Sequence, residues 1–159
     1  KLTLVEFGDF QCPACGAWEP MVRQVLADNK DTLKMSYRHF PLTQIHRNAL
    51  ISAKASEAAS LQGKFWEMHD KLYAQQAEWS EINDPQPKYE AYARGLGLDV
   101  TKFKNDMKSK DVKARVEKDK KLAGELGIPG TPTISVNGKI VEANSTQDIT
   151  NAIASALAQ

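Results

Sequence analysis

Residues 2–15, Leu-Thr-Leu-Val-Glu-Phe-Gly-Asp-Phe-Gln-Cys-Pro-Ala-Cys, decide the fold of this 159-residue chain. Leu2–Phe7 is a short apolar run that ends at Gly8-Asp9, which is typical of a strand buried on both faces. Residues 13–27 carry apolar side chains along one face of a 3.6-residue period, which predicts a helix. Pro13 suits its first position, where an N–H would have no intrahelical partner. The stretch therefore predicts a strand, a loop and a helix that begins at a Cys-x-x-Cys pair.

The composition excludes several classes of protein. The chain is 42% hydrophobic and 26% charged, which is ordinary for a soluble globular domain and unlike a disordered or collagen-like chain. Lys and Arg number 21 against 20 for Asp and Glu, so the strong basic bias of a nucleic-acid-binding protein is absent. No apolar run is long enough for a transmembrane helix. The length predicts one domain, with room for an insertion.

The rest of the chain alternates between strand and helix signals. Residues 35–40 read as a second strand, and residues 45 to about 122 read as a series of helices with a linker at 83–87. Asn137-Gly138 lies between two short apolar segments and predicts a hairpin with a type I′ turn. A last helix covers residues 149–157, with Ser145 or Thr146 as its N-cap. The predicted order is β-α-β, a helical block, then β-β-α.

The two cysteines, Cys12 and Cys15, carry the predicted chemistry. Cys12 precedes a helix N-terminus, where free backbone N–H groups and the helix dipole favour a negative charge. A thiol in such a place has a depressed pKa, in the range of roughly 3.5–7.5. We therefore expect Cys12 to be the attacking thiolate, and Cys15, one turn further along, to be the buried thiol that resolves the mixed disulfide.

Two other interpretations of the cysteine pair are open. A purely structural disulfide would contribute only about 2 kcal/mol, because the loop that it closes is so short. Half of a zinc site would need further ligands, and the candidates are His39, His46 and His69. These histidines are not spaced as a ligand pair, and we interpret them as packed, hydrogen-bonded residues. We expect no metal and no cofactor.

Three further residues are unusual for their positions. Glu6 interrupts the first strand six positions before Cys12, where a carboxylate could relay the proton of Cys15. The alternative is an outward-facing or paired glutamate, with Asp9 and Lys34 as possible charge partners. Thr131-Pro132 precedes a strand, and a cis-proline there could leave backbone groups free to capture an extended peptide.

Several segments together resemble the DsbA-like thiol-disulfide oxidoreductases. The segments that carry the resemblance are Val5–Cys15, Arg38–Leu42, His46 with the alanine-rich run to Ala59, Gln62–Leu72 and Gly127–Thr133. The resemblance implies a thioredoxin fold formed by residues 1–44 and 127–159, interrupted by a helical insertion at 45–126. It implies a cis Pro132, a buried acid at Glu6, and a Thr131 that tunes Cys12 and contacts substrate. The two residues between the cysteines are Pro13 and Ala14, whereas the best-known member of the family has proline and histidine at these positions.

The resemblance also implies a function. A member of this family would be a monomer outside the cytoplasm, could be anchored to the membrane in its precursor, and would oxidise exported proteins. A quinone-linked membrane protein of the DsbB or VKOR kind would reoxidise it. Two alternatives are open. One is a disulfide reductase or isomerase of the same fold, and the other is a peptide-binding or chaperone-like module with an incidental cysteine pair.

Overall fold

The computed structural model describes residues 1–159 and contains a four-stranded mixed sheet. The strands are β1 (Leu2–Gly8), β2 (Leu33–His39), β3 (Thr133–Val136) and β4 (Lys139–Val141). Their order across the sheet is β2-β1-β3-β4, so β1 and β3 are central. β1 pairs parallel to β2 and antiparallel to β3, and β4 is the antiparallel edge. The predicted β-α-β and β-β-α order is therefore confirmed.

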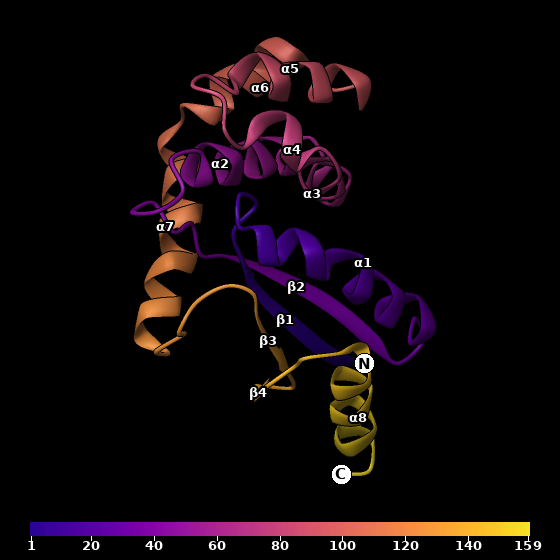
Figure 1. The fold of residues 1–159 in the computed structure, drawn as a ribbon. Coiled ribbons are helices and arrows are strands. Elements are labelled where there is room, and N and C mark those ends of the chain that lie inside the picture. The colour runs from indigo at the N-terminus through magenta and orange to yellow at the C-terminus, as the bar shows by residue number, and fades with distance from the viewer.

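Eight helices surround and extend this sheet (Figure 1). They are α1 (Pro13–Asp28), α2 (Ala49–Ser60), α3 (Phe65–Ala74), α4 (Gln76–Trp79), α5 (Gln86–Gly95), α6 (Val100–Met107), α7 (Lys110–Glu125) and α8 (Thr146–Leu157). Helices α2 to α6 form a layer beyond α1, and the longer α7 leads back from that layer to the sheet (Figure 1). None of the eight combines the length and apolarity that crossing a membrane requires.

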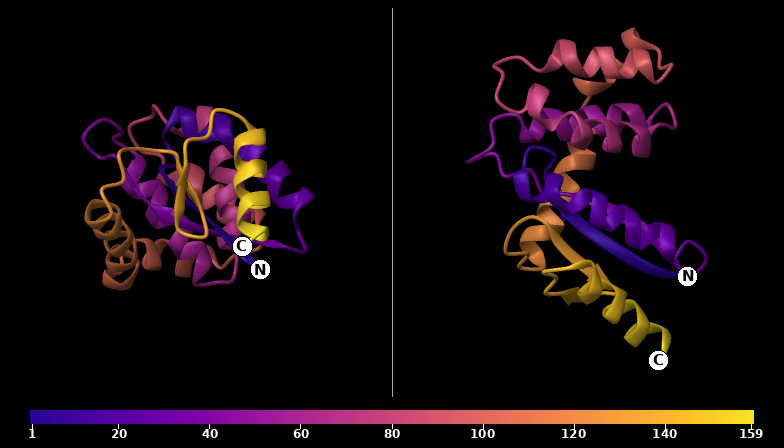
Figure 2. Two further views of the ribbon diagram at one scale, coloured as in Figure 1. Left: turned by 90° about the horizontal axis from the view of Figure 1, so that it is seen from below. Right: turned by 45° about the vertical axis from the view of Figure 1, so that its right-hand side comes forward.

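The alternating side chains of β1 separate the two faces of the sheet. Leu4 is fully buried in a hydrophobic cluster to which α1 contributes Val22 and α8 contributes Ile149. Phe7 points to the opposite face and packs against Ala123 of α7. The sheet therefore lies between α7 on one side and α1 with α8 on the other (Figure 2). Glu6 shares the α1 face with Leu4, because their side chains alternate with those of Val5 and Phe7.

The largest core cluster joins the Cys-x-x-Cys loop to the helical layer. Phe10, Cys12 and Cys15 pack in one group with residues of α2, α3, α5 and α6. Tyr37 of β2 and Tyr73 of α3 meet through their hydroxyl groups, whose oxygens are 2.7 Å apart. The helical layer thus shares its core with the loop that carries the cysteines, and does not form a separate globule beside it.

The structure corrects the sequence prediction at four places. The second strand begins at Leu33, two residues before the predicted start. The first helix after it begins only at Ala49, since residues 41–48 form turns held by the loop around Asp9. The four-residue helix α4 was not predicted, and α8 begins at Thr146, three residues before the predicted start. By contrast, the Asn137-Gly138 turn is confirmed, with φ angles of 48° and 81°, and Ser145 caps α8 through a capping box.

Candidate active site

Cys12 and Cys15 lie at the N-terminus of α1, which points toward the helical layer (Figure 1). Cys12 is the N-cap residue with an extended backbone (φ −65°, ψ 121°), and no side chain caps this end of the helix. The backbone N–H groups of the first turn are therefore free for a ligand or a charge. Both cysteines are free thiols; Cys12 is 7% exposed and Cys15 is completely buried. Pro13 and Ala14 between them are exposed to solvent.

The environment of Cys12 favours its thiolate. Hydrogen bonding from the Cys15 thiol is the main cause, and partial burial opposes it. The Thr131 side chain and the backbone N–H groups of Ala14 and Cys15 also favour the thiolate. Together these contacts lower the pKa of Cys12 from 9.0 to about 5. Cys12 is consequently a thiolate at neutral pH, which is the reactive form of a cysteine.

The environment of Cys15 has the opposite effect. Its thiol donates a hydrogen bond to the Cys12 sulfur and is cut off from solvent, and both effects raise the pKa of Cys15 well above its ordinary value. The negative charge of the Cys12 thiolate acts in the same direction, as does that of Glu6 when it ionises. The pair therefore holds one thiolate and one thiol, which is the arrangement needed for attack by one sulfur and release by the other.

Glu6 is buried on the same face of β1, with 2% of its surface exposed. Burial, reinforced by the charges of Glu19 and Cys12, raises the pKa of Glu6 from 4.5 to about 8. No ion pair joins Glu6 to another residue, so neither predicted charge partner holds it; Asp9 binds His46, and Lys34 only lines a cavity beside it. Glu6 is therefore a buried carboxyl group that carries a proton at neutral pH.

The loop before β3 places Thr131 and Pro132 beside Cys12. The Thr131–Pro132 peptide bond is cis. The Cys12 sulfur lies 3.6 Å from the carbonyl oxygen of Thr131, which accepts the hydrogen bond of the thiol. The Thr131 hydroxyl oxygen is buried without another partner, so it can donate to the thiolate once the thiol proton has gone. Thr131 thus lies next to the Cys12 sulfur, and the cis Pro132 follows it directly in the chain.

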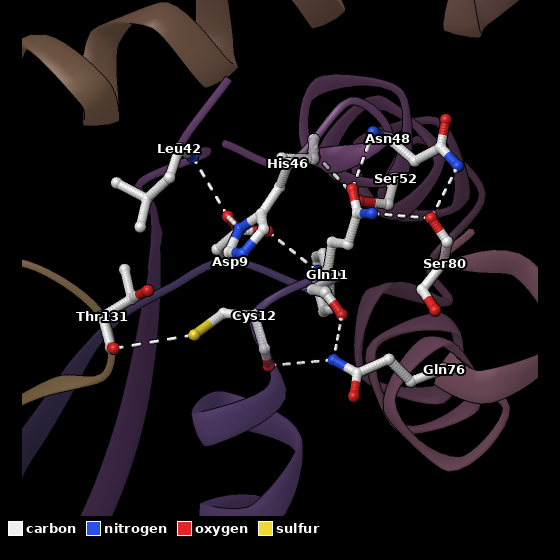
Figure 3. A network of polar contacts seen from close by, with 12 residues as sticks. Asp9, Gln11, Cys12, Leu42, His46, Asn48, Ser52, Gln76, Ser80 and Thr131 are labelled. Carbon is white, nitrogen blue, oxygen red and sulfur yellow. Dashed lines mark hydrogen bonds and ion pairs between the residues drawn. The ribbon is translucent and has the colours of Figure 1, made fainter. Parts of the chain in front are cut away.

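A buried carboxylate holds the loop that precedes Cys12 (Figure 3). Asp9 accepts hydrogen bonds from the backbone N–H groups of Gln11 and Leu42, at 2.8 and 3.1 Å. His46 lies 2.7 Å away through its Nδ1 atom. Asp9 thus ties the loop to the chain that leaves β2.

Two side-chain amides join the same loop to the helical layer (Figure 3). Gln76 of α4 donates to the carbonyl oxygens of Phe10 and Cys12, at 2.7 and 2.9 Å. Gly16 permits this approach, because a Cβ atom there would lie 2.6 Å from the Gln76 Oε1 atom. Gln11 accepts from the backbone of Asn48 at 2.7 Å. Sequence reasoning missed these contacts, because nothing in the pattern links residues so far apart along the chain.

The histidines do not join the cysteines. His39 lies 2.7 Å from Glu57, His46 contacts Asp9, and His69 contacts Asp70 at 2.9 Å. The zinc alternative therefore has no geometric support at the cysteine pair. The one cluster with metal-like spacing comprises Glu19, His69 and Asp70, whose ligand atoms lie within 4.8 Å of one another, and Arg23 already bridges its two carboxylates.

This chain is similar to a family model, to curated proteins and to solved structures. The thioredoxin family model matches residues 1–155. A protein named Na(+)/H(+) antiporter NhaA 1 from Salinispora arenicola is 41% identical over 138 residues, covering 87% of this chain and 20% of that protein. A probable disulfide bond formation protein D from Bacillus cereus is 34% identical over 153 residues, covering 86% of this chain and 66% of that protein. The chain thus spans about a fifth of the length of the first curated relatives it matches.

The fold is also that of solved disulfide oxidoreductases. The crystal structure of oxidised BdbD from Bacillus subtilis superposes with a TM-score of 0.88 at 25% identity, covering 99% of this chain and 88% of that one. The match takes in both the sheet and the helical layer, so the interruption of the fold by helices is common to the two proteins. This confirms the predicted thioredoxin fold.

Proposed function

We propose that this chain, which belongs to the thioredoxin family, is a thiol-disulfide oxidoreductase of the DsbA and BdbD type that donates its Cys12–Cys15 disulfide to other proteins. The observation that carries the proposal is the unequal pair of thiols at the start of α1. The pKa of Cys12 falls to about 5 while that of Cys15 rises. A stabilised thiolate favours the reduced form of the protein, so its disulfide is readily given up.

The reaction then follows from the positions of the two sulfurs. A substrate thiolate attacks the Cys12 sulfur, the Cys12–Cys15 bond breaks, and its electron pair goes to the Cys15 sulfur, which takes up a proton. A second substrate thiolate attacks the mixed disulfide at the substrate sulfur and releases Cys12 as a thiolate. The substrate leaves with a disulfide, and the protein has gained two electrons. Glu6 is the proposed proton donor to Cys15, because it is the buried acid on this side of β1.

Thr131 and Pro132 are the proposed substrate contacts. Both are partly exposed, and the carbonyl oxygen of Thr131 lies 3.6 Å from the Cys12 sulfur. An extended peptide carrying the attacking thiol could pair with backbone groups of this loop. The substrate chain would thereby be held with its sulfur close to Cys12.

We further propose an extracytoplasmic place of action. Stable disulfides form in oxidising compartments, so reduced exported proteins are the proposed substrates. The disulfide must be restored after each cycle, and a quinone-linked membrane partner of the DsbB or VKOR kind is the proposed reoxidant. The name of the Bacillus cereus relative, a disulfide bond formation protein, supports the oxidising direction. Residues 45–126 are proposed as the insertion that sets this protein apart from a minimal thioredoxin fold.

The proposed oxidising direction of the reaction can be tested by unfolding the reduced and the oxidised protein in urea. At pH 7 we expect the reduced protein to be more stable than the oxidised protein, because the Cys12 thiolate stabilises only the folded, reduced form. The pKa of Cys12 is lower in the folded protein, so this advantage is present at high pH and is lost as the pH falls toward 5. A more stable oxidised form at pH 7 would instead indicate a reductase.

A further inference from the structure

A cavity of about 390 Å³ lies between α1, α3 and the first two strands. Glu6 lines its inner part, and Glu19 and Arg23 of α1 and His69 and Asp70 of α3 also line it. Glu6 and His69 are buried, with 2% and 4% of their surfaces exposed, whereas the side chain of Asp70 is 45% exposed. The cavity therefore connects the buried acid of the active site with charged groups at the surface, and it is wide enough for several water molecules.

Two buried polar atoms on this cavity have no partner in the protein. They are Glu6 Oε1 and His69 Nε2. Buried polar atoms nearly always form hydrogen bonds, so an unpartnered pair on one cavity requires a reason. Both residues line the same cavity, and a carboxyl group and an imidazole are two kinds of side chain that take up and give back protons in catalysis.

The surroundings of His69 fix both its orientation and its proton. Its ring packs edge-on against Tyr37, Tyr73 and Trp66, at centroid distances of 5.0 to 5.2 Å. The Nδ1 atom lies 2.9 Å from the Asp70 carboxylate. Because an ionised carboxylate can only accept, Nδ1 carries the proton and Nε2 is left with a free lone pair. His69 can thus take a proton at Nε2 and give one up at Nδ1, or the reverse.

We propose that His69 passes protons between Glu6 and the solvent-facing Asp70 during disulfide exchange, through water in this cavity. The proposal rests on the proposed function. When the Cys12–Cys15 bond breaks, the Cys15 sulfur takes the proton of the Glu6 carboxyl group. Glu6 then recovers a proton from solvent by way of His69. In the opposite direction Glu6 accepts the Cys15 proton and His69 carries it out. No oxidant beyond the protein disulfide is needed.

Other charged groups also face this path. Glu19 and Arg23 of α1 form an ion pair at its mouth, and Arg23 also approaches Asp70 at 3.5 Å. Lys30 after α1 and Lys34 of β2 line the same cavity. Among them Glu19 acts on both ends of the path, because its charge raises the pKa of Glu6 and its carboxylate lies within 4.8 Å of the ligand atoms of His69 and Asp70. His69 is the one imidazole on the cavity, and so the one side chain there that offers both a donor and an acceptor nitrogen on a single ring.

The test measures exchange in both directions at pH 7. Oxidised protein is mixed with reduced glutathione and reduced protein with oxidised glutathione, and the thiol content is followed after acid quenching. His69→Gln keeps a polar side chain and His69→Phe keeps the aromatic packing, but neither carries a proton. We expect both variants to slow both directions about tenfold, with the reduction potential unchanged. Imidazole added to His69→Ala should restore the rates.

Leu26→Met is the matched control, because Leu26 lines the same cavity, has no titratable group and is not one of the rings packed against His69. It should exchange at the wild-type rate. Rates of the His69 variants within about twofold of wild type, or slower rates together with a shifted potential, would overturn the role of His69. A wild-type protein that exchanges in neither direction would refute the proposed function itself, and the role of His69 with it.

Discussion

Replacing Cys12 by serine is expected to abolish disulfide exchange, leaving only the uncatalysed rate. Cys12 is the thiolate of the pair, while the Cys15 sulfur is completely buried and holds its proton. A serine hydroxyl at this position cannot form the mixed disulfide, and Cys15 cannot replace it as the nucleophile. The loss is measured by incubating the reduced variant with oxidised glutathione and counting protein–glutathione adducts by mass spectrometry.

Cys15→Ser is the matched variant and should behave in the opposite way. Its Cys12 thiolate still attacks glutathione disulfide, but no second thiol is present to release the product. The protein should therefore accumulate one glutathione adduct per chain, whereas Cys12→Ser should accumulate none. An adduct on Cys12→Ser and none on Cys15→Ser would reverse the roles assigned to the two cysteines.

Replacing Glu6 by glutamine is expected to remove a large pH dependence of stability. The pKa of Glu6 is raised from 4.5 to about 8 in the folded protein, chiefly by burial. Its contribution to stability is therefore present below pH 4.5 and is lost as the pH rises toward 8. At pH 7 the raised pKa of Glu6 makes the folded protein about 3 kcal/mol less stable than it is at low pH, where Glu6 is protonated in both the folded and the unfolded state. Urea unfolding of the reduced protein at about pH 4.5 and about pH 7.5 measures the difference.

The unfolding free energies of wild type and Glu6→Gln must be compared across the pH range and not at one pH, because burying the glutamine amide also costs stability. The reduced wild-type protein should lose stability over this range relative to Glu6→Gln. Because the charge of Cys12 is coupled to Glu6, both proteins are also compared in a Cys12→Ser background, where this second titration is absent. Glu81→Gln, at an exposed position, is the control and should follow the wild-type profile. Parallel profiles for wild type and Glu6→Gln would contradict a raised pKa at Glu6.

Much of the architecture could be predicted because its signals are local. The apolar run before Gly8, the proline after Cys12 and the Asn137-Gly138 pair each fix a backbone conformation within a few residues. Helix α4 was missed because four residues are too few to show a period. The start of β2 was misplaced because Lys34 is exposed and interrupts the apolar pattern.

The site was less predictable where it depends on contacts between distant segments. The order of the two cysteines followed from their position at a helix start, and burial of Glu6 accounts for its odd place in a strand. The amide of Gln76 on the Phe10 and Cys12 carbonyls is different, because it depends on how the helical layer folds back over the loop. The same holds for His69, which sequence reasoning treated only as a packed residue.

The reduction potential of the Cys12–Cys15 pair tests the central claim most directly. The protein is equilibrated in glutathione buffers of known ratio, and the fraction reduced is read from thiol labelling. An unequal thiol pair that favours the reduced protein predicts a potential well above about −200 mV, in the range of strong protein oxidants. A potential near roughly −270 mV, as in thioredoxin, would contradict the oxidising role and make the protein a reductant.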